Sequence, residues 1–508
     1  MLRRDLVRRI SRVTSSFVRG QTYATETDCK PFQDIPGPKG IYQWPLIGTM
    51  LLFKPFTEFT AETVHKLIDS MFDRYGPVVR LQLGREMVMV SDVRDIETVF
   101  RREGKYPNRP PIELVEVLFE RNGYKKSIMI EQGENWYKLR SAVNKRLMKA
   151  DSASHYLEPQ NLVADDFVQI LANQKLEPEQ LSDLFYRYAS ESIGVVTFNK
   201  RLGFMDGSAD KEEREFLEAS KVAFEQIHMS MSGKSVLHKF YRNKTYRTFE
   251  QAIWVMKRNS SAHAAKAREI IKQKEKEGTL NPEEPNLLLS LASEKNFSDE
   301  DVSNMIDSLY TAGTDSTAKN LQAIFFNLAR NPEKQELLRQ EVDRVIGPDK
   351  PLTAKALTEM VYLKACVKES FRLLFPTLSG TGRVLPVDVV LGGYRVPAGT
   401  FIILGNPRAS KVYFDEPDNF IPERWLRSGP SHKQDSTQTL AVLPFGHGPR
   451  NCIGQRFATQ EMYLATAKVL QKLKIELEPE SWNTEFVYRV FIDPKVPLKF
   501  KFSPVQQA

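Results

Sequence analysis

A helix long enough to cross a whole domain is the strongest structural signal in the sequence, between residues 298 and 332. Ser298 and Asp301 are three residues apart, as in a capping box, and Pro332 marks the far end. A helix rises by about 1.5 Å per residue, so this one would pass through the core. One hydrophobic stripe on it comprises Val302, Met305, Leu309, Ala312 and Ser316. The spacing therefore predicts a hydroxyl on the apolar face of a central helix.

The rest of the chain predicts a mainly α architecture with a minor β part (α+β). A helical pattern covers residues 58–76, and two strand-like runs follow at 77–83 and 85–91. Residues 130–345 are mostly helical in pattern, and the polar stretch 272–286 is interpreted as a surface loop. Short strands return within residues 393–405. No clean linker divides the middle of the chain, so we expect one large catalytic domain.

Charge and cysteine content narrow the class of protein. The net charge is +8, but residues 1–20 hold six arginines and one acid, which leaves only about +3 elsewhere. That distribution argues against a nucleic-acid partner. The basic, serine-rich start resembles a mitochondrial transit peptide, with a disordered basic tail as the alternative. We expect a transit peptide at 1–30 and the catalytic domain at 31–508. Three cysteines in 508 residues indicate a reduced compartment.

Two segments bear on membranes. No stretch approaches the 18 apolar residues of a membrane span, so we expect no membrane anchor. Residues 227–249 mix apolar and basic side chains. They are interpreted either as a surface loop or as a monotopic membrane contact.

The loop "FGHGPRNCIGQRF" at 445–457 places a cysteine just before a helical run. Backbone N–H groups, a helix N-terminus and nearby cations all favour a thiolate at Cys452. Arg450 could bind a carboxylate. Zinc is disfavoured because no second cysteine or histidine stands at finger spacing, and His447 is interpreted as a solvated loop residue. A single thiolate suits a cofactor that brings its other ligands itself, as haem does.

This loop resembles the haem-binding signature of the cytochrome P-450 family, with matches at Phe445, Gly448, Arg450, Cys452 and Gly454. The resemblance implies the single large cytochrome P-450 fold and a bound haem b (iron protoporphyrin IX). It implies Cys452 as the axial thiolate ligand, with Phe445 and Arg450 in the haem site.

Further motifs extend the resemblance. Trp136 and Arg140, four apart on a helix, are similar to the family's pair that contacts a haem propionate, and Arg383 is similar to a further propionate-binding arginine. Glu369 and Arg372 match the family's core ion pair, whose third member would be Arg424. The resemblance implies that this ion pair locks the region that holds the cysteine loop.

Residues 312–317, "AGTDST", resemble the family's oxygen-activation motif. The resemblance implies that Asp315, Ser316 and Thr317 guide protons to bound O2. Serine replaces the usual threonine at position 316, so we expect retained but leakier proton delivery. Two structural interpretations remain open, in which Ser316 is a satisfied core hydroxyl and Asp315 a structural carboxylate.

The transit-like start of the chain and the absence of a membrane anchor resemble the features of the mitochondrial branch of the family. The branch implies an acidic, adrenodoxin-like iron–sulfur ferredoxin and its NADPH-dependent reductase as electron donors. Lys364, Lys368 and Arg456 match its docking cations, although Gln455 stands where a first arginine is common. In the alternative interpretation these are merely solvated charges.

We therefore expect a monooxygenase that inserts one atom of O2 into a lipophilic substrate. The branch implies a sterol, steroid or secosteroid, with a xenobiotic as an alternative, and a peripheral location on the matrix side of the inner mitochondrial membrane. Two rival functions remain: a haem-thiolate isomerase or dehydratase, and a non-catalytic haem-binding protein.

Overall fold

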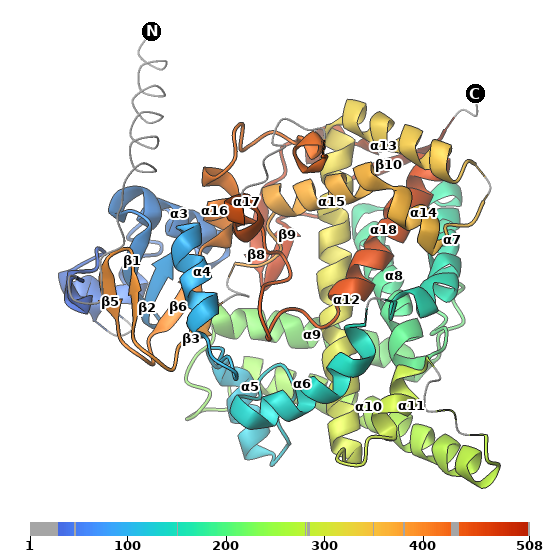
Figure 1. Cartoon of the computed structure of the whole chain (residues 1–508), viewed down its shortest axis with the longest axis horizontal. Coiled ribbons are helices and arrows are strands. Elements are labelled where there is room, and N and C mark those ends of the chain that lie inside the picture. Colours follow the sequence, from blue (N-terminus) through green and yellow to red (C-terminus); the bar gives the residue numbers. More distant parts are fainter. Residues whose placement is uncertain are drawn as a thin grey trace.

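A computed structural model describes residues 29–44, 47–149, 151–279, 281, 285–348, 350–378, 382–427 and 436–505. The predicted transit peptide, apart from Cys29 and Lys30, lies outside the described residues. Figure 1 shows helices filling most of the molecule, with the main sheet gathered on one side. The expectation of a mainly α fold with a minor β part is confirmed.

Helix α12 (Asp299–Arg330) runs through the middle of the helical part (Figure 1). Its start has the predicted capping box, because the Ser298 hydroxyl accepts from the Asp301 amide at 3.2 Å and the Asp301 carboxylate accepts from the Ser298 amide at 2.8 Å. Helices packed against it include α8 (Pro178–Phe198), α10 (Lys244–Lys276), α15 (Val361–Leu373) and α18 (Gln455–Lys472). The prediction of a central core helix is confirmed.

Further helices complete the helical part. They are α5 (Glu113–Arg121), α6 (Gly133–Leu147), α7 (Leu157–Asn173), α9 (Lys211–Met231), α11 (Leu287–Ala292), α13 (Pro332–Val345) and α14 (Ala354–Glu359). The expected loop at 272–286 is partly wrong, since α10 continues to Lys276. Lysine, glutamine and glutamate at 272–276 are good helix formers, and the chain leaves the helix only at Gly278, which has φ +66°.

The main sheet has the strand order β1-β2-β6-β3. Strand β1 (Val78–Leu83) pairs antiparallel with β2 (Arg85–Val90), β2 pairs parallel with β6 (Phe401–Leu404), and β6 pairs antiparallel with the two-residue β3 (Arg383–Val384). Side chains alternate between its faces: Val88 and Val90 join the cluster under α4 (Val93–Arg102), while Met87 and Met89 join the cluster under α3 (Val64–Tyr75). This sheet fixes the start of β3, where Arg383 lies.

Three two-stranded antiparallel sheets and several short helices lie outside the main sheet. Two of these sheets are hairpins, β4 (Val389–Leu391) with β5 (Tyr394–Val396) and β8 (Phe486–Arg489) with β9 (Phe491–Pro494), and the third pairs β7 (Leu473–Leu477) with β10 (Phe500–Pro504). The short helices are α2 (Ile47–Leu51), α16 (Asn406–Val412), α17 (Ser436–Ala441) and the 3-10 turn η5 (Pro422–Trp425). Within the described ranges, no helix is both long and apolar enough to span a bilayer.

Candidate active site

The cysteine loop lies between α17 and the start of α18. The Cys452 amide donates to the Phe445 carbonyl at 2.8 Å, which closes the loop on itself. The Phe445 ring meets Phe371 of α15 edge-on at 5.7 Å between centroids. Gly448 has φ +75°, and a Cβ there would lie 2.2 Å from Glu103 Oε1. Glycine is therefore required at 448 both by backbone conformation and by the close approach of Glu103.

Opposing effects act on the Cys452 thiol. Burial raises its pKa, whereas the backbone N–H groups of Gly454 and Gln455 and the charges of Arg140 and Arg109 lower it. The protein thus surrounds this sulfur with hydrogen-bond donors and cations, but these groups do not ionise the thiol by themselves. A bound metal cation would complete the ionisation, because thiolates ligate metals in the deprotonated form.

Cys366 is the contrasting case. It is fully buried in α15, and burial together with Glu341, Glu423 and Glu369 raises its pKa well above the usual value. Surroundings of this kind keep a thiol protonated and inert. Of these two cysteines, Cys452 is the one whose surroundings favour a ligand.

Buried arginines converge around the loop, including all three that the sequence predicts. Arg140 on α6 donates to the Asn451 carbonyl at 2.8 Å and to its side-chain oxygen at 2.6 Å. Arg450 donates to the Pro107 carbonyl at 2.8 Å, and its guanidinium lies 4.7 Å from the Trp136 ring centroid. Arg383 on β3 pairs with Glu103 at 2.5 Å. Three separate elements therefore deliver cations to one place.

Sequence reasoning missed two members of this cluster. Arg109 donates to the Arg450 carbonyl at 2.7 Å, and Glu103, only 3% exposed, holds Arg383. Burial, followed by repulsion from other arginines, lowers the pKa of Arg109 to about 10 and that of Arg450 to about 9. No spacing signal marks these residues, because their partners are hundreds of positions away along the chain.

The donor set fits haem. Repulsion among the buried arginines indicates excess positive charge, and the Nε atoms of Arg109 and Arg140 have no hydrogen-bond partner. Two propionate carboxylates beside a thiol would satisfy both conditions, since buried charges need pairing. A Cβ on Gly454 would meet nothing within 4 Å, so the backbone there faces open space.

The middle of α12 is less buried around Ser316 than on either side of it. From Ser308 to Ala329, every residue is buried except Ala312, Gly313 and Ser316, which are half-buried. The Ser316 hydroxyl donates to the Ala312 carbonyl at 2.6 Å. Between Ser308 and Ala329 the helix thus exposes one small notch that carries a hydroxyl.

The three expected catalytic residues point to different partners. Asp315 accepts from the Tyr186 hydroxyl at 2.8 Å and from the Lys319 ammonium at 3.1 Å. Thr317 donates to Glu461 on α18 at 2.7 Å, and burial raises the pKa of Glu461 to about 7. The structure does not bring the Asp315 carboxylate onto the Ser316 hydroxyl. Glu461 is a further buried acid beside the motif that the sequence did not indicate.

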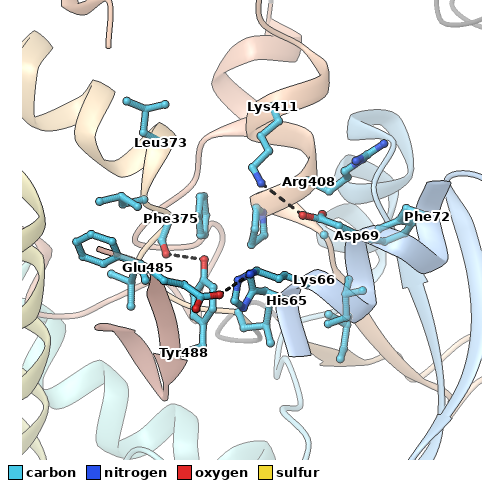
Figure 2. A pocket seen from close by; sticks show the side chains of 18 of the residues that line it. His65, Lys66, Asp69, Phe72, Leu373, Phe375, Arg408, Lys411, Glu485 and Tyr488 are labelled. Atoms are coloured by element: carbon cyan, nitrogen blue, oxygen red, sulfur yellow. Dashed lines mark hydrogen bonds and ion pairs between the residues drawn. The ribbon is translucent and has the colours of Figure 1, made fainter. Parts of the chain in front are cut away.

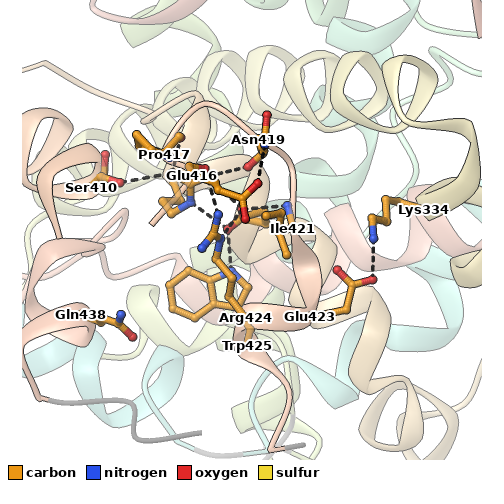
Figure 3. A network of polar contacts seen from close by, with 12 residues as sticks. Lys334, Ser410, Glu416, Pro417, Asn419, Ile421, Glu423, Arg424, Trp425 and Gln438 are labelled. Atoms are coloured by element: carbon orange, nitrogen blue, oxygen red, sulfur yellow. Dashed lines mark hydrogen bonds and ion pairs between the residues drawn. The ribbon is translucent and has the colours of Figure 1, made fainter. Parts of the chain in front are cut away.

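The ion-pair network forms between α15 and η5 (Figure 3). Glu369 and Arg372 are both fully buried and joined by two hydrogen bonds, at 2.8 and 2.9 Å. Arg424 reaches the same carboxylate at 3.3 Å, and the Trp425 indole N–H donates to it at 2.9 Å. The structure thus brings the three residues together.

The three expected docking cations differ in their surroundings. The Lys368 ammonium lies 3.9 Å from the Trp425 ring centroid, and burial lowers its pKa. Lys364 donates to the Thr358 carbonyl at 2.9 Å, and burial lowers its pKa as well. Arg456 is exposed and donates to the Met148 carbonyl at 3.2 Å. Lys368 is therefore tied to the ion-pair network through Trp425.

Two cavities lie away from these residues. The larger, about 340 Å³, is enclosed by α3, α16, the end of α15 and β8, and is bordered by the ion pairs Lys66–Glu485 and Lys411–Asp69 (Figure 2). The smaller, about 80 Å³, lies between α5, α9, α10 and α12. None of the site residues expected from the sequence lines either cavity.

Comparisons with known proteins agree with this geometry. The family model "Cytochrome P-450" matches residues 38–502. The chain is 30% identical to a probable mitochondrial cytochrome P-450 12a5 of Drosophila melanogaster, over 94% of this chain and 91% of that protein. It is 28% identical to the mitochondrial sterol 26-hydroxylase of Oryctolagus cuniculus, over 92% of this chain and 89% of that protein. It is also 28% identical to cytochrome P-450 10 of Lymnaea stagnalis, over 94% and 87%.

Proposed function

The chain belongs to the cytochrome P-450 family of haem-dependent monooxygenases, and we propose that it works in mitochondria with Cys452 as the iron ligand. The observation that carries this assignment is that the backbone N–H groups of Gly454 and Gln455 and the charges of Arg140 and Arg109 all act on the Cys452 sulfur. When bound, haem supplies the activation of O2 that inserts one oxygen atom into a C–H bond.

The arginine cluster would hold the haem carboxylates. Arg140, Arg383 and Arg450 are the proposed propionate partners, and Arg109 joins them from a segment that the sequence did not single out. The Trp136 indole lies under Arg450 and limits its rotation. Phe445 closes the loop around Cys452. Glu369, Arg372 and Arg424 are proposed to fix the neighbouring segment through their mutual contacts.

Proton delivery is proposed to pass through the α12 notch. Ser316 is half-buried there, so its hydroxyl can break its hydrogen bond to the Ala312 carbonyl and form one to a water molecule or to the substrate. The Asp315 carboxylate already accepts hydrogen bonds from Tyr186 and Lys319. We propose that Asp315 and Thr317 position the helix beside the notch and pass protons only when these partners rearrange.

Electrons are proposed to come from an acidic, adrenodoxin-like ferredoxin and its NADPH-dependent reductase. The mitochondrial relatives support this donor, and Lys364, Lys368 and Arg456 are its proposed contacts. The sterol 26-hydroxylase relative supports a sterol, steroid or secosteroid as the substrate, with a xenobiotic as the alternative.

A peripheral membrane contact on the matrix side of the inner mitochondrial membrane completes the proposal. The loop between α9 and α10 exposes Phe240 (84%), Tyr241 (66%) and Leu237 (55%). Beside this loop, Lys234 pairs with Glu62 at 3.0 Å, close to the segment that exposes Trp44, Met50 and Phe56. These apolar side chains support the membrane interpretation of residues 227–249. The transit peptide at 1–30 and the catalytic domain at 31–508 stay part of the proposal.

The test is reconstitution of the purified protein with a mitochondrial ferredoxin, its reductase, NADPH and a lipid extract. We expect a product that is heavier by one oxygen atom and absent without ferredoxin. Labelled O2 should place its isotope in the product. Turnover without a donor would instead indicate an isomerase or dehydratase, and a haem spectrum without any product would indicate a non-catalytic haem protein.

A further inference from the structure

We propose that the smaller cavity binds a hydroxyl group of the substrate through Asp307 and Thr311 of α12. Within the described residues, Asp307 Oδ1 and Thr311 Oγ1 are buried atoms without a hydrogen-bond partner, and both residues line this cavity. The remaining walls are mostly apolar and include Val115, Phe119, Met129, Phe224, Phe249 and Met256. Unpaired polar atoms in such a place need a ligand or water.

The helix presents both groups to one side. Asp307 and Thr311 are four residues apart, so they lie one above the other on α12. Ser308 and Ser316 on the same helix satisfy their hydroxyls by donating to the carbonyls of the residues four positions earlier, at 2.7 and 2.6 Å. The Thr311 hydroxyl makes no such bond, although the helix offers one. Its proton is thus available to the cavity.

The Asp307 carboxyl has an unsatisfied oxygen. Ser260 of α10 lies near this carboxyl and lowers its pKa, while Oδ1 has no hydrogen-bond partner. Burial raises the pKa of Asp307 to about 7, so the protonated and the ionised carboxyl are both populated near neutral pH, and the ionised form accepts a hydrogen bond. Lys257 lies nearby, but its ammonium donates to Asn304 at 2.8 Å and stacks on the Tyr124 ring at 4.4 Å.

A hydroxyl is the chemical group that fits this pair. It can donate to Asp307 Oδ1 and accept from Thr311 Oγ1 at the same time, whereas an ether or ketone cannot donate. The charge of Lys257, which lines the same cavity, disfavours an ammonium group. A volume of about 80 Å³ admits one end of a ligand and not the whole of a large one.

The position of the pair also constrains the substrate. Nine residues separate Asp307 from Ser316 along α12, which corresponds to about 13 Å at about 1.5 Å per residue. Because this inference rests on the proposed monooxygenase function, the notch at Ser316 marks the level at which oxygen is inserted. The substrate class is therefore an elongated lipophile with a hydroxyl near one end, oxidised toward the other end.

The experiment titrates the holoenzyme with 1-dodecanol, its methyl ether and dodecylamine, and follows binding calorimetrically and by the haem absorption shift. We expect the alcohol to bind roughly tenfold more tightly than the ether, the effect of one hydrogen bond to a buried group. Asp307→Leu and the isosteric Thr311→Val should remove most of that preference, and Asp307→Asn should retain part of it. Ser308→Ala is the matched control, because its hydroxyl is already satisfied by Asn304, and should leave the preference unchanged.

Each outcome decides the proposal. No alcohol preference in the unmodified protein, absence of binding by both alcohol and ether, or an unchanged preference in both Asp307→Leu and Thr311→Val overturns it. Tighter binding of the amine overturns the assignment of a hydroxyl. The ferrous–CO spectrum of each variant separates misfolding from loss of binding. The alcohol preference is measured without turnover, so it can be observed even if reconstitution yields no oxygenated product. An oxygenated product without any alcohol preference overturns the hydroxyl site and leaves the proposed monooxygenase function in place.

Discussion

The Cys452 sulfur is the atom on which the cofactor assignment depends. Cys452→Ala should abolish the red-shifted ferrous–CO band, because the thiolate ligand is lost while the arginine cluster remains. Cys366→Ala is the matched control and should keep the band, since that thiol is buried in α15 with its pKa far above the usual value. The measurement is the reduced, CO-saturated absorption spectrum. Persistence of the band in Cys452→Ala would contradict the ligand assignment.

At this scale, the sequence predicts residues that belong to short motifs and misses those defined by folding. Cys452, Arg450 and Gly448 stand within five positions of one another, so their types and spacing are visible locally. Glu103 and Arg109 become part of the site only because the sheet and α6 bring distant segments together. The hydrogen bond that Tyr186 donates to Asp315 joins residues 129 positions apart, so no local pattern predicts it, whereas Lys319 lies four residues after Asp315 on the same helix.

The contact between α15 and η5 depends on one carboxylate. Glu369→Gln should destabilise the protein by about 3–5 kcal/mol, because Arg372 and Arg424 would remain buried without their counter-charge. The control is Glu423→Gln, in a partly exposed pair with Lys334 at 2.9 Å in the same segment (Figure 3), which should cost less than about 1 kcal/mol. Denaturant unfolding of both variants measures the difference. Equal losses would mean that the buried network contributes no more than a surface pair.

The contact between α12 and α18 should make stability depend on pH. Burial raises the pKa of Glu461 from 4.5 to about 7, so the folded state binds more protons than the unfolded state between these values. The contribution of Glu461 to the free energy of unfolding is therefore fully present below about pH 4.5. It falls by about 3 kcal/mol in all as the pH rises to about 7.

Glu461→Gln tests this dependence, because its amide oxygen can still accept from Thr317. The variant should match the unmodified protein near pH 4.5 and be more stable by up to about 3 kcal/mol at pH 8. Thermal unfolding midpoints at the two pH values measure the effect. A gain of the same size at both would show that Glu461 does not titrate in this range.

At the scale of helices and strands, the sequence predicts elements with strong periodicity, but it does not predict how these elements pack. The cap and the end of α12 follow from Ser298, Asp301 and Pro332 in the sequence, and the two strands at 78–90 follow from their alternation. The notch at Ala312 and Ser316 does not follow, because exposure there depends on which neighbouring helices leave a gap. The stripe predicts only that Ser316 shares a face with buried residues.

At the scale of the whole molecule, the exposed apolar loop predicts membrane binding. The double variant Phe240→Ser, Tyr241→Ser should bind anionic phospholipid vesicles more weakly, because it lacks the two exposed rings that membrane binding removes from water. Burial of such side chains is worth about 1.5–3 kcal/mol each, so we expect at least a tenfold loss. Leu337→Ser on α13, where 44% of the residue is exposed, is the control. Vesicle sedimentation measures the binding, and an equal loss in the control would contradict a defined membrane face.

The proposed electron delivery by an acidic ferredoxin requires a face of the molecule that recognises this partner. Lys364→Gln and Arg456→Gln should each raise the KM for ferredoxin a few-fold and leave kcat at saturation nearly unchanged, because an exposed pair is worth at most about 1 kcal/mol. Docking of the unmodified protein should weaken as the Debye length falls from about 10 Å at 0.1 M salt to about 3 Å at 1 M. Lys495→Gln, beside α3 and the β8–β9 hairpin, makes the same charge change elsewhere.

Lys368 should behave differently from its neighbours, because its ammonium stacks on Trp425, which in turn donates to Glu369. Lys368→Gln is expected to raise the KM for ferredoxin and also to lower the unfolding temperature, whereas Lys364→Gln should change the KM alone. Steady-state reduction kinetics and thermal unfolding, measured on the same preparations, separate the two effects. If Lys495→Gln raised the KM as much as Lys364→Gln, the interaction would reflect net charge and not a docking face. A shared location for docking and for the ion-pair network would mean that the donor binds beside α15, the helix that contacts the cysteine loop through Phe371 and Phe445.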